Sequence, residues 1–471
     1  MPRIIQGGMG VAISGWQLAK AVSRQGHLGV VSGTGLNLVF AQRLQQGDEG
    51  SHLRRALKHF PIPSVAEDIL RKHFNVHRTN GRSAVRGVPM FTLDASDDLL
   101  KLTIAANFCE VFLAKEGHKG VVGINLLEKV QLPNLASLYG AMLAGVDYVL
   151  MGAGIPREIP GVLDKLAKHE MATLKFRVED AASDEDIRIM LDPKLLFGEQ
   201  LPLLQRPKFI AIVSSDVLAQ VLIQKASGCI DGLVIENDLA GGHNAPPRGA
   251  MKLTQSGEPI YGQRDAANID KIREMGLPFW LAGDYASPEK LHAALAVGAT
   301  GIQVGTDFAF CAESGLEKDL RDRTLEQLAI GEVEVFTDPV ASSTGFPFKV
   351  VQLSGTLSEK AVYDDRSRLC QIGLLRQAYK KEDGEIGYRC PGEPVSNYVR
   401  KGGKLEDTTG RKCLCNALMA NAGLAQEQSS GYIEKPLLTA GDSLKRLKHY
   451  LTNGIRNYTA SDVIDYLLSP V

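Results

Sequence analysis

The stretch that decides the fold is residues 232–244, which read GLVIENDLAGGHN. A short apolar run ends in Glu236, and two glycines and His243 follow shortly after it. The run is typical of a buried strand, and the glycines indicate main chain that another group approaches closely. His243 would then lie at the C-terminal end of its strand, where barrels of alternating strands and helices carry their chemistry.

Two later strands end in a similar way. Each ends in a glycine followed by a polar residue: the strand predicted over 279–282 precedes Gly283-Asp284, and that over 301–304 precedes Gly305-Thr306. In barrels, the loops after the last two strands often bind phosphate through bare main-chain N–H groups. We therefore expect a phosphate-bearing ligand here, beside a histidine. Ala282 would lie at the strand end, and Thr306 would add a hydroxyl donor.

Composition excludes several classes of function. The chain has 471 residues, 44% of them hydrophobic, with a formal net charge of −1. It can therefore bury one large core and a second lobe, but it has no strong field to hold nucleic acid or an anionic membrane. No apolar run approaches the roughly 20 residues of a membrane helix, and a strand from Arg3 leaves no room for a signal peptide. Seven cysteines in a long chain are typical of a reducing compartment, so we expect a cytoplasmic protein.

The alternation of strands and helices predicts a (β/α)8 TIM barrel with insertions and a mainly helical C-terminal lobe. The eight strands expected for the barrel are 3–6, 28–32, 121–125, 148–151, 209–213, 233–236, 279–282 and 301–304. The run 172–178 also reads as a strand, but we favour 209–213 because a helix over 216–226 follows it. The main rival is a doubly wound open sheet. We expect the barrel over 1–335, with insertions at about 47–88 and 181–207, and the lobe over 336–471, capping the barrel mouth.

The end of the first strand is a further candidate. Residues 6–10 read Gln-Gly-Gly-Met-Gly, and Ser14 is placed to cap a helix over 15–24. Met9 could lie against a flat ring, and Gly10 could expose main-chain N–H groups toward it. The alternative reading is a core methionine beside a turn.

Histidine and cysteine carry different expectations. Histidine as a residue type can titrate near neutral pH, so His243 could act as a base or a hydrogen-bond donor; the alternative is a histidine that only fixes its loop. Four C-terminal cysteines are candidate zinc ligands, namely Cys370, Cys390, Cys413 and Cys415. Their spacing is not Cys-x-x-Cys, so we expect ordinary thiols and no metal. A Walker loop, a Rossmann fingerprint and a nucleophile elbow are all missing from the sequence, which leaves hydrolases and kinases without support.

Taken together, these motifs resemble the nitronate monooxygenase family, formerly called 2-nitropropane dioxygenases, from Ile4 to about Lys349. The Ala-Gly-Gly-His run at 240–243 and the Gln-Val-Gly-Thr run at 303–306 are the most specific parts. The resemblance implies an FMN-binding TIM barrel, with a smaller helical domain over the flavin and His243 as the catalytic residue. It implies the following cofactor contacts: Gly283, Asp284, Gly305 and Thr306 near the phosphate, Met9, Gly10 and Asn125 near the ring system, and Glu236, Ala240, Gly241 and Gly242 along the ribityl side and the active site.

Two departures from the family pattern bear on the substrate. Gly8 stands where the family usually has proline. The family's Thr-Gly-Arg-Pro-Ala-Arg run is here Thr-Gly-Phe-Pro-Phe-Lys over 344–349, so both basic positions are altered. A more distant resemblance is to the flavin enoyl reductases of polyunsaturated fatty acid and polyketide synthesis.

Three functions follow from these resemblances. The leading one is an FMN-dependent flavoprotein monooxygenase that oxidises alkyl nitronates with O2. The second is an NAD(P)H-dependent flavin reductase acting on an enoyl thioester, an enone or a quinone. The third is a non-catalytic flavin-binding module. In the first two, the partners are a small-molecule substrate with O2 or NAD(P)H, without nucleic acid or membrane, and a homodimer is compatible with the sequence.

Overall fold

The computed structural model describes residues 1–74, 87–454 and 457–471. Its largest sheet has eight parallel strands in the order β1-β11-β10-β9-β8-β4-β3-β2. Main-chain hydrogen bonds between Leu28 and the first strand, at 2.9 and 3.1 Å, bring the two edges together. The (β/α)8 barrel is therefore confirmed. Its strands are β1 (Ile4–Gln6), β2 (Gly29–Ser32), β3 (Val122–Leu127), β4 (Tyr148–Gly152), β8 (Lys208–Val213), β9 (Gly232–Glu236), β10 (Phe279–Ala282) and β11 (Gly301–Val304).

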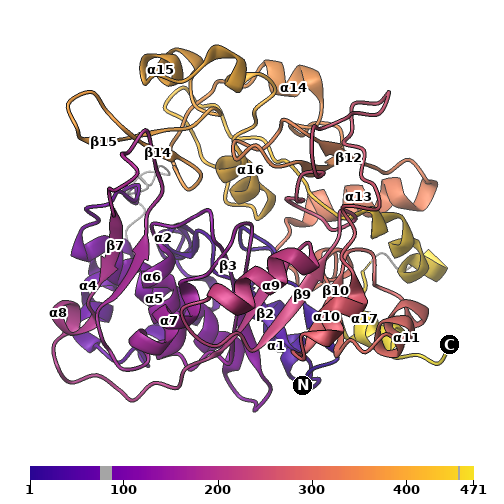
Figure 1. Cartoon of the computed structure of the whole chain (residues 1–471), viewed down its shortest axis with the longest axis horizontal. Coiled ribbons are helices and arrows are strands. Elements are labelled where there is room, and N and C mark those ends of the chain that lie inside the picture. The colour runs from indigo at the N-terminus through magenta and orange to yellow at the C-terminus, as the bar shows by residue number, and fades with distance from the viewer. Residues whose placement is uncertain (75–86, 455–456) are drawn as a thin grey trace.

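Helices surround this sheet (Figure 1). They are α1 (Trp16–Ser23), α2 (Leu36–Gln45), α5 (Asp97–Lys115), α6 (Asn134–Leu143), α7 (Ile159–Leu166), α9 (Asp216–Lys225), α10 (Ile269–Glu274), α11 (Pro288–Ala296), α12 (Thr306–Ala309) and α13 (Lys318–Ile330). The strands are apolar on both faces because helices cover the outside and large side chains fill the inside. A separate buried cluster includes Ile5, Val30, Leu150 and Trp280, one from each of four strands. This cluster closes the barrel interior, so a ligand must bind at a barrel end.

The ambiguous run at 172–178 lies outside the barrel. β5 (Ala172–Lys175) pairs antiparallel with β7 (Arg188–Leu191), and β6 (Val178–Glu179) pairs with a strand of the C-terminal region. β8 takes the fifth place in the barrel, between β4 and β9, which confirms the choice of 209–213. The insertion before it also carries α8 (Pro193–Phe197).

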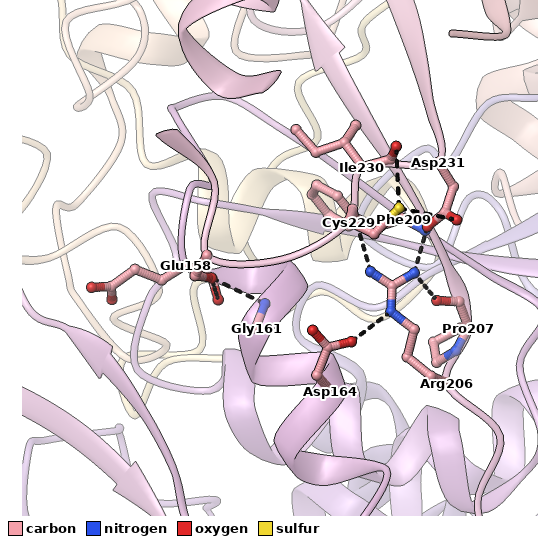
Figure 2. Close-up of polar contacts among 10 residues, drawn as sticks. Glu158, Gly161, Asp164, Arg206, Pro207, Phe209, Cys229, Ile230 and Asp231 are labelled. Atoms are coloured by element: carbon pink, nitrogen blue, oxygen red, sulfur yellow. Dashed lines mark hydrogen bonds and ion pairs between the residues drawn. The ribbon is translucent and has the colours of Figure 1, made fainter. Parts of the chain in front are cut away.

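Arg206 joins the end of this insertion to the base of the barrel (Figure 2). Its Nε donates to Asp164 of α7 at 3.0 Å, and its Nη2 donates to the carbonyl oxygen of Cys229 at 2.6 Å. Its Nη1 contacts Asp231, whose carboxylate also accepts from the Phe209 main chain at 2.7 Å. One guanidinium thus ties a helix to the starts of two barrel strands.

The C-terminal region is mainly helical, as expected, but it also contains two hairpins that the sequence did not indicate. The hairpins are β12 (Glu334–Asp338) with β13 (Phe348–Gln352), and β14 (Gln377–Lys380) with β15 (Ile386–Arg389). Its helices are α14 (Lys360–Asp364), α15 (Val395–Arg400), η2 (Leu405–Thr408), α16 (Leu414–Asn421), η3 (Asp442–Gly454) and α17 (Ala460–Leu467). In Figure 1, α14, α15 and α16 lie above the barrel elements.

The chain then returns to the barrel wall. α17 packs against α1 and α11, and Val463, Ile464 and Leu467 are buried in the main core.

The first insertion contains η1 (Glu49–Ser51), α3 (His52–Leu57) and α4 (Pro63–His73), while its residues 75–86 lie outside the described residues. Among the helices that are described, none has the length and apolar character needed to cross a bilayer.

Candidate active site

A cavity of about 830 Å³ opens at the C-terminal ends of the barrel strands, a volume typical of a cofactor site. The loops after the strands form one part of its wall, and the C-terminal region forms the rest. Every site residue predicted from the sequence lines it: Met9, Gly10, Asn125, Glu236, Ala240, Gly241, Gly242, His243, Ala282, Gly283, Asp284, Gly305 and Thr306. The structure thus brings the whole set together, while the role of each residue stays a prediction.

Ser14 organises the loop after β1. Its hydroxyl donates to the carbonyl oxygen of Gly7 at 3.1 Å and accepts from the Met9 main chain at 2.8 Å. The prediction that Ser14 caps α1 is wrong, because Gly15 is the cap residue and Glu110 accepts from the first helical N–H at 2.7 Å. Ser14 instead fixes the loop that carries Met9 into the cavity wall.

Gly8 is explained by its neighbour Asn125. A Cβ atom on Gly8 would lie 2.2 Å from the Cβ of Asn125, far inside van der Waals contact. Asn125 is buried and its amide donates to the carbonyl oxygen of Leu150 at 3.4 Å. This chain therefore needs glycine where the resemblance led us to expect proline.

The loops after β10 and β11 present main chain to the cavity. Gly283 has a φ of +91°, and a Cβ there would lie 1.8 Å from the amide oxygen of Asn237. At Gly305, a Cβ would meet only Met9, at 3.7 Å. Within the described residues, the N–H groups of Gly305 and Thr306 donate to no protein acceptor. A phosphate group fits this end of the cavity, because unpaired amides on a side-chain-free loop are the donors that it needs.

The C-terminal region completes this end of the cavity. The Gly441 N–H donates to the Thr306 hydroxyl at 2.9 Å, and the Gly242 N–H donates to the Thr439 hydroxyl, also at 2.9 Å. Ser443 is buried and lines the cavity as well. Sequence reasoning missed these residues because Gly441 lies 135 positions from its partner and carries no recognisable motif.

His243 lies on the loop after β9 and is half-buried. Its Nε2 bonds the Ser342 hydroxyl at 2.7 Å, and its ring meets Phe348 edge to face at a centroid distance of 4.9 Å. Burial, assisted by the charge of Lys129, lowers the pKa of His243 to about 4. The imidazole is therefore neutral at pH 7 and has one nitrogen free to accept a proton.

Glu236 and Gln303 are polar side chains without partners. Burial raises the pKa of Glu236 to about 7, and no described residue forms a hydrogen bond or an ion pair with its carboxyl group. The Oε1 atom of Gln303 is buried and lacks a partner among the described residues. Both residues line the cavity, so a ligand could satisfy them. Gln303 lies inside the Gln-Val-Gly-Thr run, but the sequence analysis did not assign it a role.

The two positions of the 344–349 run where the family has arginine, Phe346 and Lys349, have different surroundings in the structure. Phe346 and Phe348 line the cavity together with leucines of the C-terminal region: Leu374, Leu375, Leu414 and Leu418. Lys349 is buried and pairs instead with Asp442, at 2.8 Å from Oδ1. One basic position has therefore become part of an apolar wall, and the other holds the C-terminal region in place.

The four C-terminal cysteines are buried or half-buried free thiols, and one of them, Cys415, lines the cavity. Burial raises the pKa of Cys370 to about 12 and that of Cys390 to about 11, which keeps both thiols protonated. Across residues 1–74, 87–454 and 457–471, no three or more His, Cys, Asp and Glu side chains are grouped as metal ligands would be.

Comparison with known families matches residues 203–342 to nitronate monooxygenase. No curated protein matches the chain. Three solved structures resemble it over 99% of its length: FabK from Thermotoga maritima (15% identity, TM-score 0.46, 91% of that chain), a nitroalkane oxidase from Streptomyces ansochromogenes (14%, 0.47, 94%) and the enoyl reductase domain of MlnA from Bacillus amyloliquefaciens (11%, 0.44, 93%). The matched segment contains β8 to β11 and His243. The resemblance to nitronate monooxygenases is thus confirmed over residues 203–342 and supports a flavin-dependent oxidoreductase.

Proposed function

We propose that this protein is an FMN-dependent monooxygenase that oxidises alkyl nitronates with O2. The observation that carries the proposal is that His243 lines the same cavity as the bare main-chain loops at Gly283 and Gly305. FMN would supply the redox chemistry when bound, and the protein would supply position and polarity.

Three groups of residues in the cavity wall would contact three different parts of FMN. The N–H groups at Gly283, Gly305 and Thr306 would hold the phosphate, beside Asp284 and Ala282. The loop after β1 and Asn125 would face the ring system. The remaining contacts, along the ribityl chain, would come from Glu236, Ala240, Gly241 and Gly242.

His243 would act on the substrate. Because its imidazole is neutral at pH 7, it can accept the α-proton of a nitroalkane. The nitronate formed carries a negative charge on the nitro group, which would stabilise the imidazolium beside it. The Ser342 hydroxyl, 2.7 Å from Nε2, would hold the ring in one orientation during this transfer.

The test is His243→Ala, measured by nitroalkane turnover under air. We expect turnover to fall by about 10²–10⁴-fold, the usual contribution of a general base, while FMN content stays unchanged. Ser342→Ala is the matched variant: it keeps the imidazole and should lose activity by a smaller factor. Unchanged turnover in His243→Ala would remove the histidine from the mechanism.

The apolar wall favours a second candidate function. Phe346, Leu375 and Leu418 offer no charge to a small nitronate but suit an enone, a quinone or an enoyl thioester. In this function, NAD(P)H would reduce the flavin and the substrate would reoxidise it. Anaerobic mixing separates the candidates: rapid bleaching by NADPH supports the reductase, and bleaching only by a nitronate supports the oxygenase. A yellow protein that neither donor bleaches would be a non-catalytic flavin-binding module.

A further inference from the structure

A carboxylate lies at the phosphate end of the cavity. Asp284 follows Gly283 directly, lines the cavity, and has only 18% of its side chain exposed. A phosphate monoester near neutral pH carries one to two negative charges, so an unpaired carboxylate here would repel it. Accepting a phosphate at this end therefore requires that the charge of Asp284 be neutralised.

Two cations meet Asp284 from different parts of the chain. Lys290 of α11 contacts its carboxylate and donates to its carbonyl oxygen at 2.6 Å. Arg446 of η3 contacts the other carboxylate oxygen and donates to the same carbonyl at 3.2 Å. The Nε of Arg446 is buried and has no partner among the described residues. The guanidinium of Arg446 thus contacts the loop after β10, and its Nε–H remains available as a hydrogen-bond donor.

The chain segment that carries Arg446 is fixed to the cavity wall. Besides the Gly441–Thr306 bond, the Asp442 N–H donates to the carbonyl oxygen of Leu239 at 3.0 Å. A Cβ on Gly441 would lie 2.7 Å from that same oxygen, so the segment packs directly on the loop after β9. Arg446 is therefore held against Asp284 by several contacts that do not involve its own side chain.

A further titratable group nearby is Asp307. It is buried, burial raises its pKa to about 7, and Arg446 favours its charged form. Tyr450 faces it, with its hydroxyl 3.5 Å from Oδ1. Lys290 and Arg446 thus bring two positive charges to Asp284, and Arg446 also favours the charged form of Asp307.

We propose that Arg446 is a positioning residue for a phosphorylated cofactor: together with Lys290 it neutralises Asp284 and so allows the cavity to accept FMN in preference to riboflavin. This inference rests on the proposed function, because it takes FMN as the ligand. It assigns to the C-terminal region a part in cofactor selection as well as in covering the site.

The test compares two ligands that differ by the phosphate alone. Apoprotein is titrated with FMN and with riboflavin, and quenching of flavin fluorescence gives each Kd. We expect Arg446→Met to weaken FMN binding about tenfold or more and riboflavin binding less than about twofold. The matched control is Lys445→Met, which removes an exposed cation from the adjacent position and should change neither Kd.

A second variant keeps the test decisive if Arg446→Met does not fold. Asp284→Asn removes the repelling charge, so it should tighten FMN binding without changing riboflavin binding, and it should restore FMN binding in the Arg446→Met background. Equal weakening of both flavins by Arg446→Met, or unchanged FMN binding, would overturn the inference and leave the proposed function standing. A wild-type protein that binds riboflavin but not FMN would overturn both.

Discussion

Replacing Glu236 by Gln should make the stability of the protein less sensitive to pH. Burial raises the pKa of Glu236 from 4.5 to about 7. The folded state therefore holds this proton more tightly than the unfolded state, and the carboxyl group contributes stability below pH 4.5 that is lost as pH rises through 7. At 1.36 kcal/mol per pH unit the full difference is about 3 kcal/mol, and solvent in the cavity should reduce it to about 1–2 kcal/mol.

The assay is urea unfolding of apoprotein at pH 4.5, 6, 7 and 8, for wild type and Glu236→Gln. Near pH 4.5 both side chains are neutral in the folded state and similar in shape, so the two free energies of unfolding should nearly coincide. At pH 8 the variant should be more stable by the stated amount. Repeating the series in about 1 M salt is the control, because salt screens exposed charges but not the burial of this one. A difference that does not change with pH, or that favours wild type at pH 8, would refute the reasoning.

Two further predictions concern neighbouring parts of the site. Gly8→Ala places a Cβ 2.2 Å from that of Asn125, so FMN affinity should fall by about tenfold or more in a fluorescence titration, and Asn125→Gly should recover part of it. An undiminished affinity in Gly8→Ala would contradict the close packing. Burial is the main cause of the low pKa of His243 and the charge of Lys129 adds to it, so Lys129→Met should raise this pKa above about 4 in an NMR titration while burial keeps it below 6.5. If the His243 pKa stays in place or falls, the coupling between the two residues is absent.

Local patterns were sufficient to predict the barrel. Each strand is a short, mostly apolar run that ends in, or is directly followed by, glycine or a polar residue, and this pattern depends only on near neighbours along the chain. The choice of 209–213 over 172–178 succeeded for the same reason, since only the former is followed by a helix that can cover it. The convergence of Gly283, Gly305 and His243 then follows from the barrel, which places the ends of all parallel strands at one rim.

Contacts between distant segments could not be predicted in this way. Ser14 has the residue type of a helix cap, but the nearby carbonyl of Gly7 and the distant Glu110 decide its role. The segment 439–446 reads as an ordinary polar stretch, and only the fold shows that it meets Thr306 and Asp284. The part of the site that the sequence missed is therefore the part supplied by the C-terminal region.

The return of α17 to the barrel wall has a consequence for how the protein is made. During synthesis, all eight strands leave the ribosome well before residues 460–467, so the nascent barrel has an uncovered apolar strip along α1 and α11 until these residues have been made. A product that stops early would keep this strip exposed and would be bound by chaperones or degraded. The position of α17 after the barrel strands thus makes a stable barrel depend on synthesis of residues 460–467.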